Sequence, residues 1–189
     1  MERRRKQRSD SPVQNFPPAC PSPGKNFPFP RVDEFRARQG RTRYPVSQPL
    51  MRLSADGSPA RPLRILIVDD TPSDVELLTL ALEPHGAEFT RLADGVAARD
   101  CLSTLRPGAF DLVLLDWRLP GVNGDELALE YLARPDRDPA LSICLITSAL
   151  PPRVTYALVE AGAHVLEKPI DLDGYDRLAA LLARLVPPG

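Results

Sequence analysis

The sequence predicts an α/β protein in which a five-stranded parallel sheet lies between two layers of helices. Short apolar runs rich in branched residues recur between residues 63 and 186 and alternate with helical stretches. Such runs are typical of strands that are buried on both faces of a parallel sheet. Clusters of Gly and Pro separate the segments, as expected for five consecutive βα units.

The first unit begins with a strand at about residues 64–69, where Ile65-Leu66-Ile67-Val68 leads into two aspartates. A helix begins at Thr71-Pro72-Ser73-Asp74, because Pro is favoured in a first helical turn. We place Glu76 in that turn, where a carboxylate favours the helix dipole. The helix stops near residues 83–86, which contain Pro and Gly.

The second and third units follow the same pattern. They comprise a strand at about 88–92, a helix at about 94–105, a strand at about 111–115 and a helix at about 125–133. Pro107-Gly108 ends the first of these helices, and the run Pro120-Gly121-Val122-Asn123-Gly124 predicts the loop before the second.

The fourth and fifth units complete the sheet. They comprise a strand at about 142–146, a helix at about 154–161, a strand at about 164–167 and a helix at about 171–185. Pro151-Pro152 precedes the fourth helix, and Gly162 ends it. Right-handed crossovers between the units give a three-layer sandwich. In the flavodoxin-like strand order 2-1-3-4-5, the first and third strands are neighbours at the switch point.

Polar side chains follow four of these strands. Asp69 and Asp70 follow the first strand, Asp116 the third, Thr147-Ser148 the fourth and Lys168 the fifth. Ligands bind at the carboxyl ends of the strands in open α/β sheets. Three carboxylates at one edge repel each other unless a cation joins them, and Mg²⁺ prefers such hard oxygen ligands. The pattern therefore favours magnesium-assisted phosphoryl transfer onto an aspartate.

These residues resemble the receiver domain of bacterial two-component response regulators, the CheY-like family. The resemblance covers about residues 63–186 and depends on three motifs in order: the Asp69-Asp70 pair, the run from Asp116 through Pro120-Gly121 to Gly124, and Lys168-Pro169. It implies a CheY-like (βα)5 fold.

The resemblance also implies the role of each site residue. Asp116 would be the phosphoacceptor, and Mg²⁺ would be held by Asp69, Asp70, Asp116 and the backbone carbonyl of Arg118. Thr147 would hydrogen-bond a phosphoryl oxygen, with Ser148 as the alternative hydroxyl, and Lys168 would pair with the phosphoryl charge. The protein would be a signalling phosphoacceptor, not an enzyme, although it would assist its own phosphorylation and dephosphorylation.

Two positions depart from the family pattern. Thr71 stands where an acidic residue often follows the pair, and Val165 stands where many receivers carry a switch Tyr or Phe. An aromatic rotamer switch on the fifth strand is therefore not expected. Arg118 stands two residues after the acceptor, where it could approach the phosphoryl group.

The segment before the predicted domain differs in composition. Residues 1–62 hold 13 Lys and Arg against 5 Asp and Glu, together with 11 of the 22 prolines, and show no sustained hydrophobic period. Such a segment cannot bury enough surface to offset its chain entropy, so we expect it to be disordered. We expect a solvated tail in Arg3–Arg8 in preference to a nucleic-acid contact, and Met51 is an alternative start of the chain. Residues 187–189 form a short tail.

The sequence contains no apolar stretch of the roughly 18 residues that a membrane span requires. Its three cysteines, Cys20, Cys101 and Cys144, form no close pair. This spacing argues against a disulfide framework or zinc site and favours the cytoplasm.

We therefore expect a single-domain response regulator, since the chain after Lys168 provides only one helix and a short tail. The expected phosphoryl donor is a histidine kinase or a histidine phosphotransfer protein, and the output is contact with a downstream protein. One rival is a phosphatase of the haloacid dehalogenase type, but its second Asp would stand where this chain has Arg118. A Rossmann domain fits poorly because no Gly-x-Gly-x-x-Gly follows the first strand. The remaining rival is a receiver-like scaffold that is not phosphorylated.

Overall fold

A computed structural model of the chain describes residues 51–53 and 59–186. Disorder is predicted for residues 1–62, of which 1–50 and 54–58 lie outside the described residues. The basic run Arg3–Arg8 and the tail at 187–189 also lie outside them.

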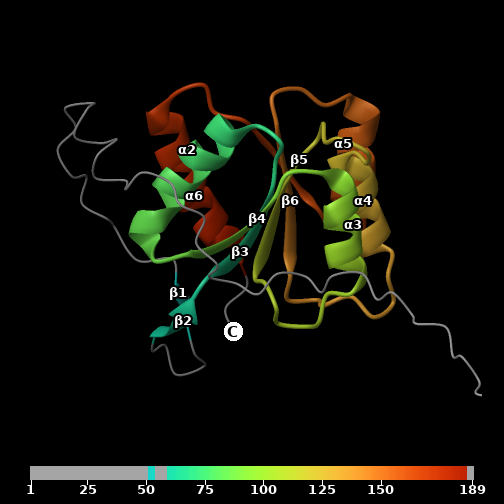
Figure 1. Cartoon of the computed structure of the whole chain (residues 1–189), viewed down its shortest axis with the longest axis horizontal. Coiled ribbons are helices and arrows are strands. Elements are labelled where there is room, and N and C mark those ends of the chain that lie inside the picture. Colours follow the sequence, from blue (N-terminus) through green and yellow to red (C-terminus); the bar gives the residue numbers. More distant parts are fainter. Residues whose placement is uncertain (1–50, 54–58, 187–189) are drawn as a thin grey trace, which may run out of the picture.

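A five-stranded sheet forms the centre of the fold (Figure 1). In chain order its strands are β3 (Arg64–Val68), β4 (Glu88–Leu92), β5 (Leu112–Asp116), β6 (Ser142–Thr147) and β7 (His164–Glu167). All four neighbouring pairs are parallel, and the spatial order is β4-β3-β5-β6-β7. This is the predicted order 2-1-3-4-5, so the expected α/β three-layer fold is confirmed.

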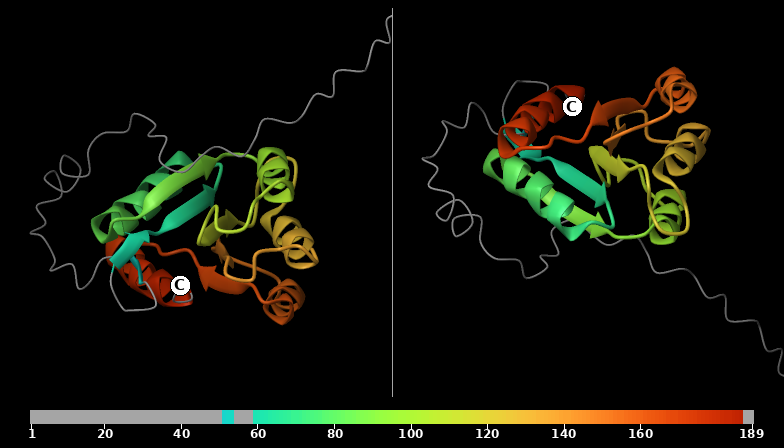
Figure 2. Two further views of the ribbon diagram at one scale, coloured as in Figure 1. Left: turned by 90° about the horizontal axis from the view of Figure 1, so that it is seen from below. Right: turned by 90° about the horizontal axis from the view of Figure 1, so that it is seen from above.

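Helices cover both faces of this sheet, as the two views of Figure 2 show. The helices are α2 (Pro72–Leu82), α3 (Gly95–Ser103), α4 (Gly124–Leu132), α5 (Pro152–Ala161) and α6 (Leu172–Leu185), with a short 3-10 turn η1 (Glu83–His85) after α2. The helices α2 and α6 pack together on one face, while α3, α4 and α5 lie on the other.

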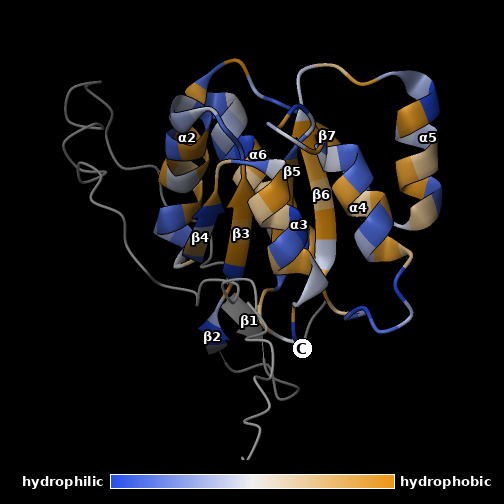
Figure 3. Cartoon of the chain, turned by 45° about the vertical axis from the view of Figure 1, so that its right-hand side comes forward, coloured by the Kyte–Doolittle hydropathy of each residue, from blue (hydrophilic) through white to orange (hydrophobic). Residues whose placement is uncertain are grey.

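Two hydrophobic clusters lie between the sheet and its helices. Alternate residues of one strand enter different clusters: Leu115 of β5 packs on the side of α3 and α4, and Leu114 packs on the side of α2 and α6. Both side chains are almost fully buried. The central strands therefore need apolar residues on both faces along most of their length, which explains the mainly hydrophobic colour of β3 and β6 in Figure 3.

Local signals in the sequence place the helix ends. Asp94 caps α3 by accepting a hydrogen bond from the Ala97 N–H at 2.8 Å, and Asp171 caps α6 in the same way. After η1, Gly86 takes a left-handed conformation with φ of 76°, which glycine adopts without strain. The strand and helix ends agree with the predicted ones to within two residues.

A short antiparallel hairpin precedes the sheet, formed by β1 (Met51–Leu53) and β2 (Pro59–Pro62). The sequence predicts no strand before residue 63, because this segment has no hydrophobic period. A contact with a buried carboxylate holds the end of this hairpin in place. The guanidinium of Arg61 makes two hydrogen bonds of 2.6 Å to the carboxylate of Asp111, whose side chain is fully buried at the start of β5.

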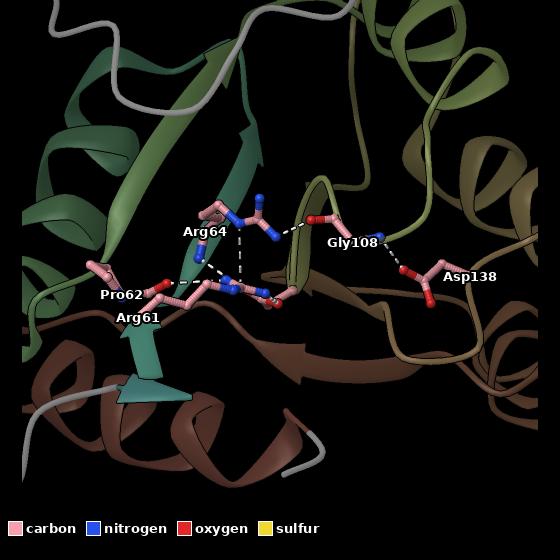
Figure 4. A network of polar contacts seen from close by, with 6 residues as sticks. Arg61, Pro62, Arg64, Gly108 and Asp138 are labelled. Atoms are coloured by element: carbon pink, nitrogen blue, oxygen red, sulfur yellow. Dashed lines mark hydrogen bonds and ion pairs between the residues drawn. The ribbon is translucent and has the colours of Figure 1, made fainter. Parts of the chain in front are cut away.

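Neighbouring residues extend this contact into a network at the amino ends of the strands (Figure 4). The backbone N–H of Arg64 also donates to Asp111, at 2.9 Å, and the side chain of Arg64 donates to the Gly108 carbonyl. The Gly108 N–H in turn donates to Asp138 at 2.6 Å. Arg61 thus belongs to the folded unit, although the sequence assigns it by charge to the basic segment.

The described helices and cysteines bear on two further expectations drawn from composition. No helix among the described residues is long and apolar enough to cross a membrane. Cys144 is a free thiol inside β6, and burial raises its pKa to about 12. Cys101 is buried in α3.

Candidate functional site

The polar residues that follow the strands meet at the carboxyl edge of the sheet. Asp69 follows β3, Asp116 ends β5, Thr147 ends β6 and Lys168 follows β7. The strand register sets this convergence, because β5 pairs with both β3 and β6, and Thr147 of β6 is opposite Glu167 of β7. The backbone N–H of Lys168 also donates to the Thr147 carbonyl at 3.0 Å.

The ammonium group of Lys168 lies at the centre of the site. Its Nζ is 2.9 Å from Asp69 Oδ2, 2.8 Å from Asp116 Oδ1 and 2.8 Å from Asp74 Oδ2. An ammonium has three donors and no acceptor, so each donor meets one carboxylate. The Lys168 side chain is 14% exposed and that of Asp69 is 3% exposed, which keeps most water away from these contacts.

Charge in this group of residues is unbalanced. One ammonium faces three carboxylates, which leaves an excess of negative charge in a half-buried place. Burial raises the pKa of Asp69, and the hydrogen bonds from Lys168 and from the Thr71 N–H only partly oppose this rise. Burial lowers the pKa of Lys168, but its hydrogen bonds to Asp116, Asp74 and Asp69 outweigh that effect and raise it overall. Lys168 is therefore charged at neutral pH.

The side chain of Asp116 is 12% exposed and held at both oxygens. Oδ1 faces Lys168, and Oδ2 accepts a hydrogen bond of 2.9 Å from the Arg118 N–H. Trp117 follows Asp116, and its indole N–H donates to Asp125 of α4 at 3.1 Å. The Arg118 guanidinium stacks on the Trp117 ring, 5.1 Å from the ring centroid.

The second glycine of the predicted loop allows α4 to approach the backbone of Asp116 closely. The Gly124 N–H donates to the Trp117 carbonyl at 2.8 Å. A Cβ on Gly124 would lie 2.1 Å from the carbonyl oxygen of Asp116. The loop pattern thus serves the site directly, because any larger residue would displace the backbone that carries the proposed acceptor.

The remaining predicted residues lie at the same edge but outside the contacts of Lys168. Asp70 is exposed, and Thr71 Oγ1 lies 3.4 Å from its Oδ1. Thr147 is buried, and its hydroxyl donates to the Ala149 carbonyl at 3.3 Å. Ser148, the alternative hydroxyl, is exposed. The roles of Asp69, Asp70, Asp116, Arg118, Thr147 and Lys168 stay predictions.

Asp74 is the residue of the site that the sequence does not reveal. It lies in the first turn of α2, a position for which the sequence favours Glu76. The only signal for Asp74 in the sequence is its position one helical turn after the acidic pair. A helix that directly follows a strand begins at the carboxyl edge of the sheet, so its first turn lies near the site.

The donor set suits a hard divalent cation in chemical type. It offers carboxylate oxygens from Asp69, Asp70 and Asp116, and the excess negative charge around Lys168 would be reduced by such an ion. Among the residues that the structure describes, no group of three or more His, Cys, Asp or Glu side chains is already arranged around a single metal position. The carboxylates of Asp69 and Asp116 are arranged around the ammonium instead.

Comparison with known proteins places this geometry in a wider context. The family described as the response regulator receiver domain matches residues 65–179. The DNA-binding response regulator MtrA of Mycolicibacterium smegmatis is 49% identical over 61 residues, which are 32% of this chain and 25% of that protein. Protein PilH of Pseudomonas aeruginosa is 34% identical over 85 residues, which are 45% of this chain and 67% of that protein.

Solved structures share the fold. The Mn²⁺-bound form of response regulator Rcp1 aligns with a TM-score of 0.59 and 23% identity, and the alignment covers 68% of this chain and 99% of Rcp1. At that identity the likeness concerns the fold alone. The chain spans about a quarter of the length of the MtrA proteins that it matches.

Proposed function

Because the chain belongs to the response regulator receiver domain family, we propose that it accepts a phosphoryl group on the carboxylate of Asp116. The observation that carries the proposal is the 2.8 Å contact between Lys168 Nζ and Asp116 Oδ1, made at the edge where four strands end. The Lys168 ammonium and the Asp116 carboxylate are both mostly buried, at 14% and 12% exposed, and the ammonium can balance the charge that a phosphoryl group brings.

The phosphoryl donor would be the phosphohistidine of a histidine kinase or of a histidine phosphotransfer protein. A carboxylate oxygen of Asp116 forms a bond to phosphorus while the bond from phosphorus to the imidazole nitrogen breaks. The imidazole nitrogen keeps the electron pair and takes a proton from solvent. Lys168 then pairs with the phosphoryl oxygens, and the Thr147 hydroxyl exchanges its bond with Ala149 for one of them.

Mg²⁺ would be held by the carboxylates of Asp69, Asp70 and Asp116 and by the carbonyl of Arg118. When bound, it would neutralise charge on the transferred group. The excess of carboxylates around Lys168 supports a cation at this place, and these ligands are all hard oxygen donors. Binding would require Asp69 and Asp116 to share their oxygens between the ion and Lys168.

The output would be contact with a downstream protein, on a surface that differs between two states. A phosphoryl group shifts such an equilibrium only if it binds one state better than the other. Thr147 is the residue proposed to sense the group. Val165 on β7 has no aromatic ring whose rotamer could change when Thr147 moves. The conformational change would therefore reach the surface through the backbone hydrogen bond between Lys168 and Thr147.

A receiver-like scaffold that is never phosphorylated is the second candidate. One observation favours it: each donor of Lys168 already has a carboxylate partner, so the site is satisfied without a phosphoryl group. Because Lys168 contacts Asp116, its ammonium would lie beside a phosphoryl group attached to that residue. For that reason we prefer the phosphoacceptor.

The two candidates differ in a labelling experiment. The purified chain is incubated with Mg²⁺ and radiolabelled acetyl phosphate, and Trp117 fluorescence is followed as each is added. A phosphoacceptor shows a fluorescence change with each addition and incorporates one acid-stable, alkali-labile label. Asp116→Asn should lose the label, whereas the exposed Asp136→Asn should keep it. A chain that takes no label and gives no response to the phosphodonor is a scaffold.

A further inference from the structure

We propose that Asp74 is a positioning residue for phosphoryl transfer, because it holds the Lys168 ammonium beside Asp116 from a helix that takes no part in the reaction. This inference rests on the proposed function and extends it to a residue outside the acceptor and metal sets. Its basis is the contact of 2.8 Å between Lys168 Nζ and Asp74 Oδ2, made across 94 residues of sequence.

The setting of Asp74 distinguishes this contact from an ordinary surface ion pair. The side chain of Asp74 is 26% exposed and that of Lys168 only 14% exposed. Asp74 is fixed in the first turn of α2, where its backbone N–H donates to the Thr71 carbonyl at 3.1 Å. The carboxylate is therefore carried on a rigid element, in the part of a helix where negative charge is favoured.

Lysine needs such support because its ammonium is a point charge on a flexible four-carbon stem. Two of its three partners are independent of the acceptor: Asp69, which also accepts the Thr71 N–H at 2.9 Å, and Asp74. With two donors held by β3 and α2, the third donor is directed at Asp116. Loss of one support would leave the ammonium free to pivot about the other.

The arrangement also suits the phosphorylated state. Once Asp116 carries an acyl phosphate, its own oxygens lose their full charge and the phosphoryl oxygens carry it. The third donor of Lys168 can follow that charge over a short distance, while Asp69 and Asp74 keep the other two donors in place. Asp74 thus fixes the position of the Lys168 ammonium before and after transfer without touching the transferred phosphoryl group.

The test compares initial rates of labelling by acetyl phosphate at saturating Mg²⁺. We expect Asp74→Ala to lower the rate about tenfold, which is less than the roughly hundredfold cost of a misplacement of about 1 Å because Asp69 still holds Lys168. Asp74→Asn keeps an acceptor but loses the charge, so its rate should lie between those of Asp74→Ala and wild type. Glu76→Gln removes the same charge from the same helix away from Lys168, and it should label at the wild-type rate. Melting temperatures show whether each variant is folded.

A double-mutant cycle separates positioning from a structural role. In a Lys168→Ala background Asp74 has nothing to hold, so Asp74→Ala should cause no further loss. The same cycle is measured at equilibrium with beryllofluoride, a phosphoryl mimic, whose binding is followed by Trp117 fluorescence. An equal loss in both backgrounds, or a wild-type rate in Asp74→Ala, overturns the inference while the phosphoacceptor function stands. A wild-type chain that accepts no label overturns both.

Discussion

Gly124 shows, at the scale of a single residue, how a loop glycine serves the proposed acceptor. Its N–H holds the Trp117 carbonyl, and its missing side chain leaves room for the carbonyl oxygen of Asp116. Gly124 does not have a left-handed backbone. Among the described glycines, those with positive φ are Gly86, Gly108, Gly121 and Gly162. The requirement at Gly124 is therefore close approach of two backbone segments and not backbone conformation.

We predict that Gly124→Ala destabilises the fold and slows labelling of Asp116. The added methyl group meets a backbone atom that cannot rotate away, and such overpacking costs about 1–3 kcal/mol. Urea unfolding measures the loss. The control is Gly86→Ala, where the added Cβ meets open space but the left-handed backbone is strained. Both variants should lose stability, and only Gly124→Ala should also label slowly. Normal labelling of Gly124→Ala would show that the loop can move without disturbing Asp116.

At the scale of elements, the tie between β2 and β5 decides where the folded unit begins. Asp111 is fully buried, so its carboxylate needs a charged partner, and Arg61 supplies two hydrogen bonds from the residue before the end of β2. Burial acts to raise the pKa of Asp111, but the hydrogen bonds from Arg61 and from the Arg64 N–H, together with their charges, lower it overall. The ion pair is therefore present at neutral pH and stabilises the base of the sheet.

We predict that Arg61→Met lowers the free energy of unfolding by about 2–4 kcal/mol at pH 7, because it leaves a buried carboxylate without its main partner. The pKa of Asp111 is depressed in the folded state, so the contribution of the pair is present above its ordinary value of 3.8. It is lost as the pH falls through the lower folded value. Urea unfolding from pH 7 to pH 3 should show the difference between wild type and variant shrinking below about pH 4. A difference that is constant with pH would mean that Arg61 acts by packing alone.

At the scale of the whole molecule, the sheet joins two hydrophobic clusters into one cooperative unit. The strand β5 contributes Leu114 to the cluster under α2 and α6 and Leu115 to the cluster under α3 and α4. Loss of packing in either cluster exposes one face of the strands on which the other cluster also packs. We therefore expect the carboxyl edge that holds Asp69, Asp116 and Lys168 to unfold together with both clusters.

We predict that Leu114→Ala and Leu115→Ala each cost about 2–5 kcal/mol, although they empty opposite faces of the sheet. Unfolding is followed by circular dichroism for the helices and by Trp117 fluorescence for the site. The two signals should coincide in wild type and in both variants, as expected for two-state unfolding. The exposed Val159→Ala of α5 is the matched control and should change stability little. A Trp117 transition separate from that of the helices would show that the two faces unfold independently.

The sequence by itself determined the α/β fold and the edge at which Asp69, Asp70, Asp116, Thr147 and Lys168 gather. It could do so because these features follow from local patterns: buried strands are continuous apolar runs, and parallel strands end at a common edge. Gly124 was likewise part of the predicted loop before α4, and the predicted second and fifth helices begin near Asp94 and Asp171.

Only the tertiary structure decided which partners meet. That Lys168 contacts Asp74 depends on how α2 lies against the strand ends, since one turn of a helix presents neighbouring residues in different directions. That Arg61 belongs to the fold depends on Asp111, which lies 50 residues away in the sequence. Hydrophobic periodicity describes neighbours along the chain, whereas a buried charge finds its partner in space, and the partner can come from a segment with no periodicity of its own.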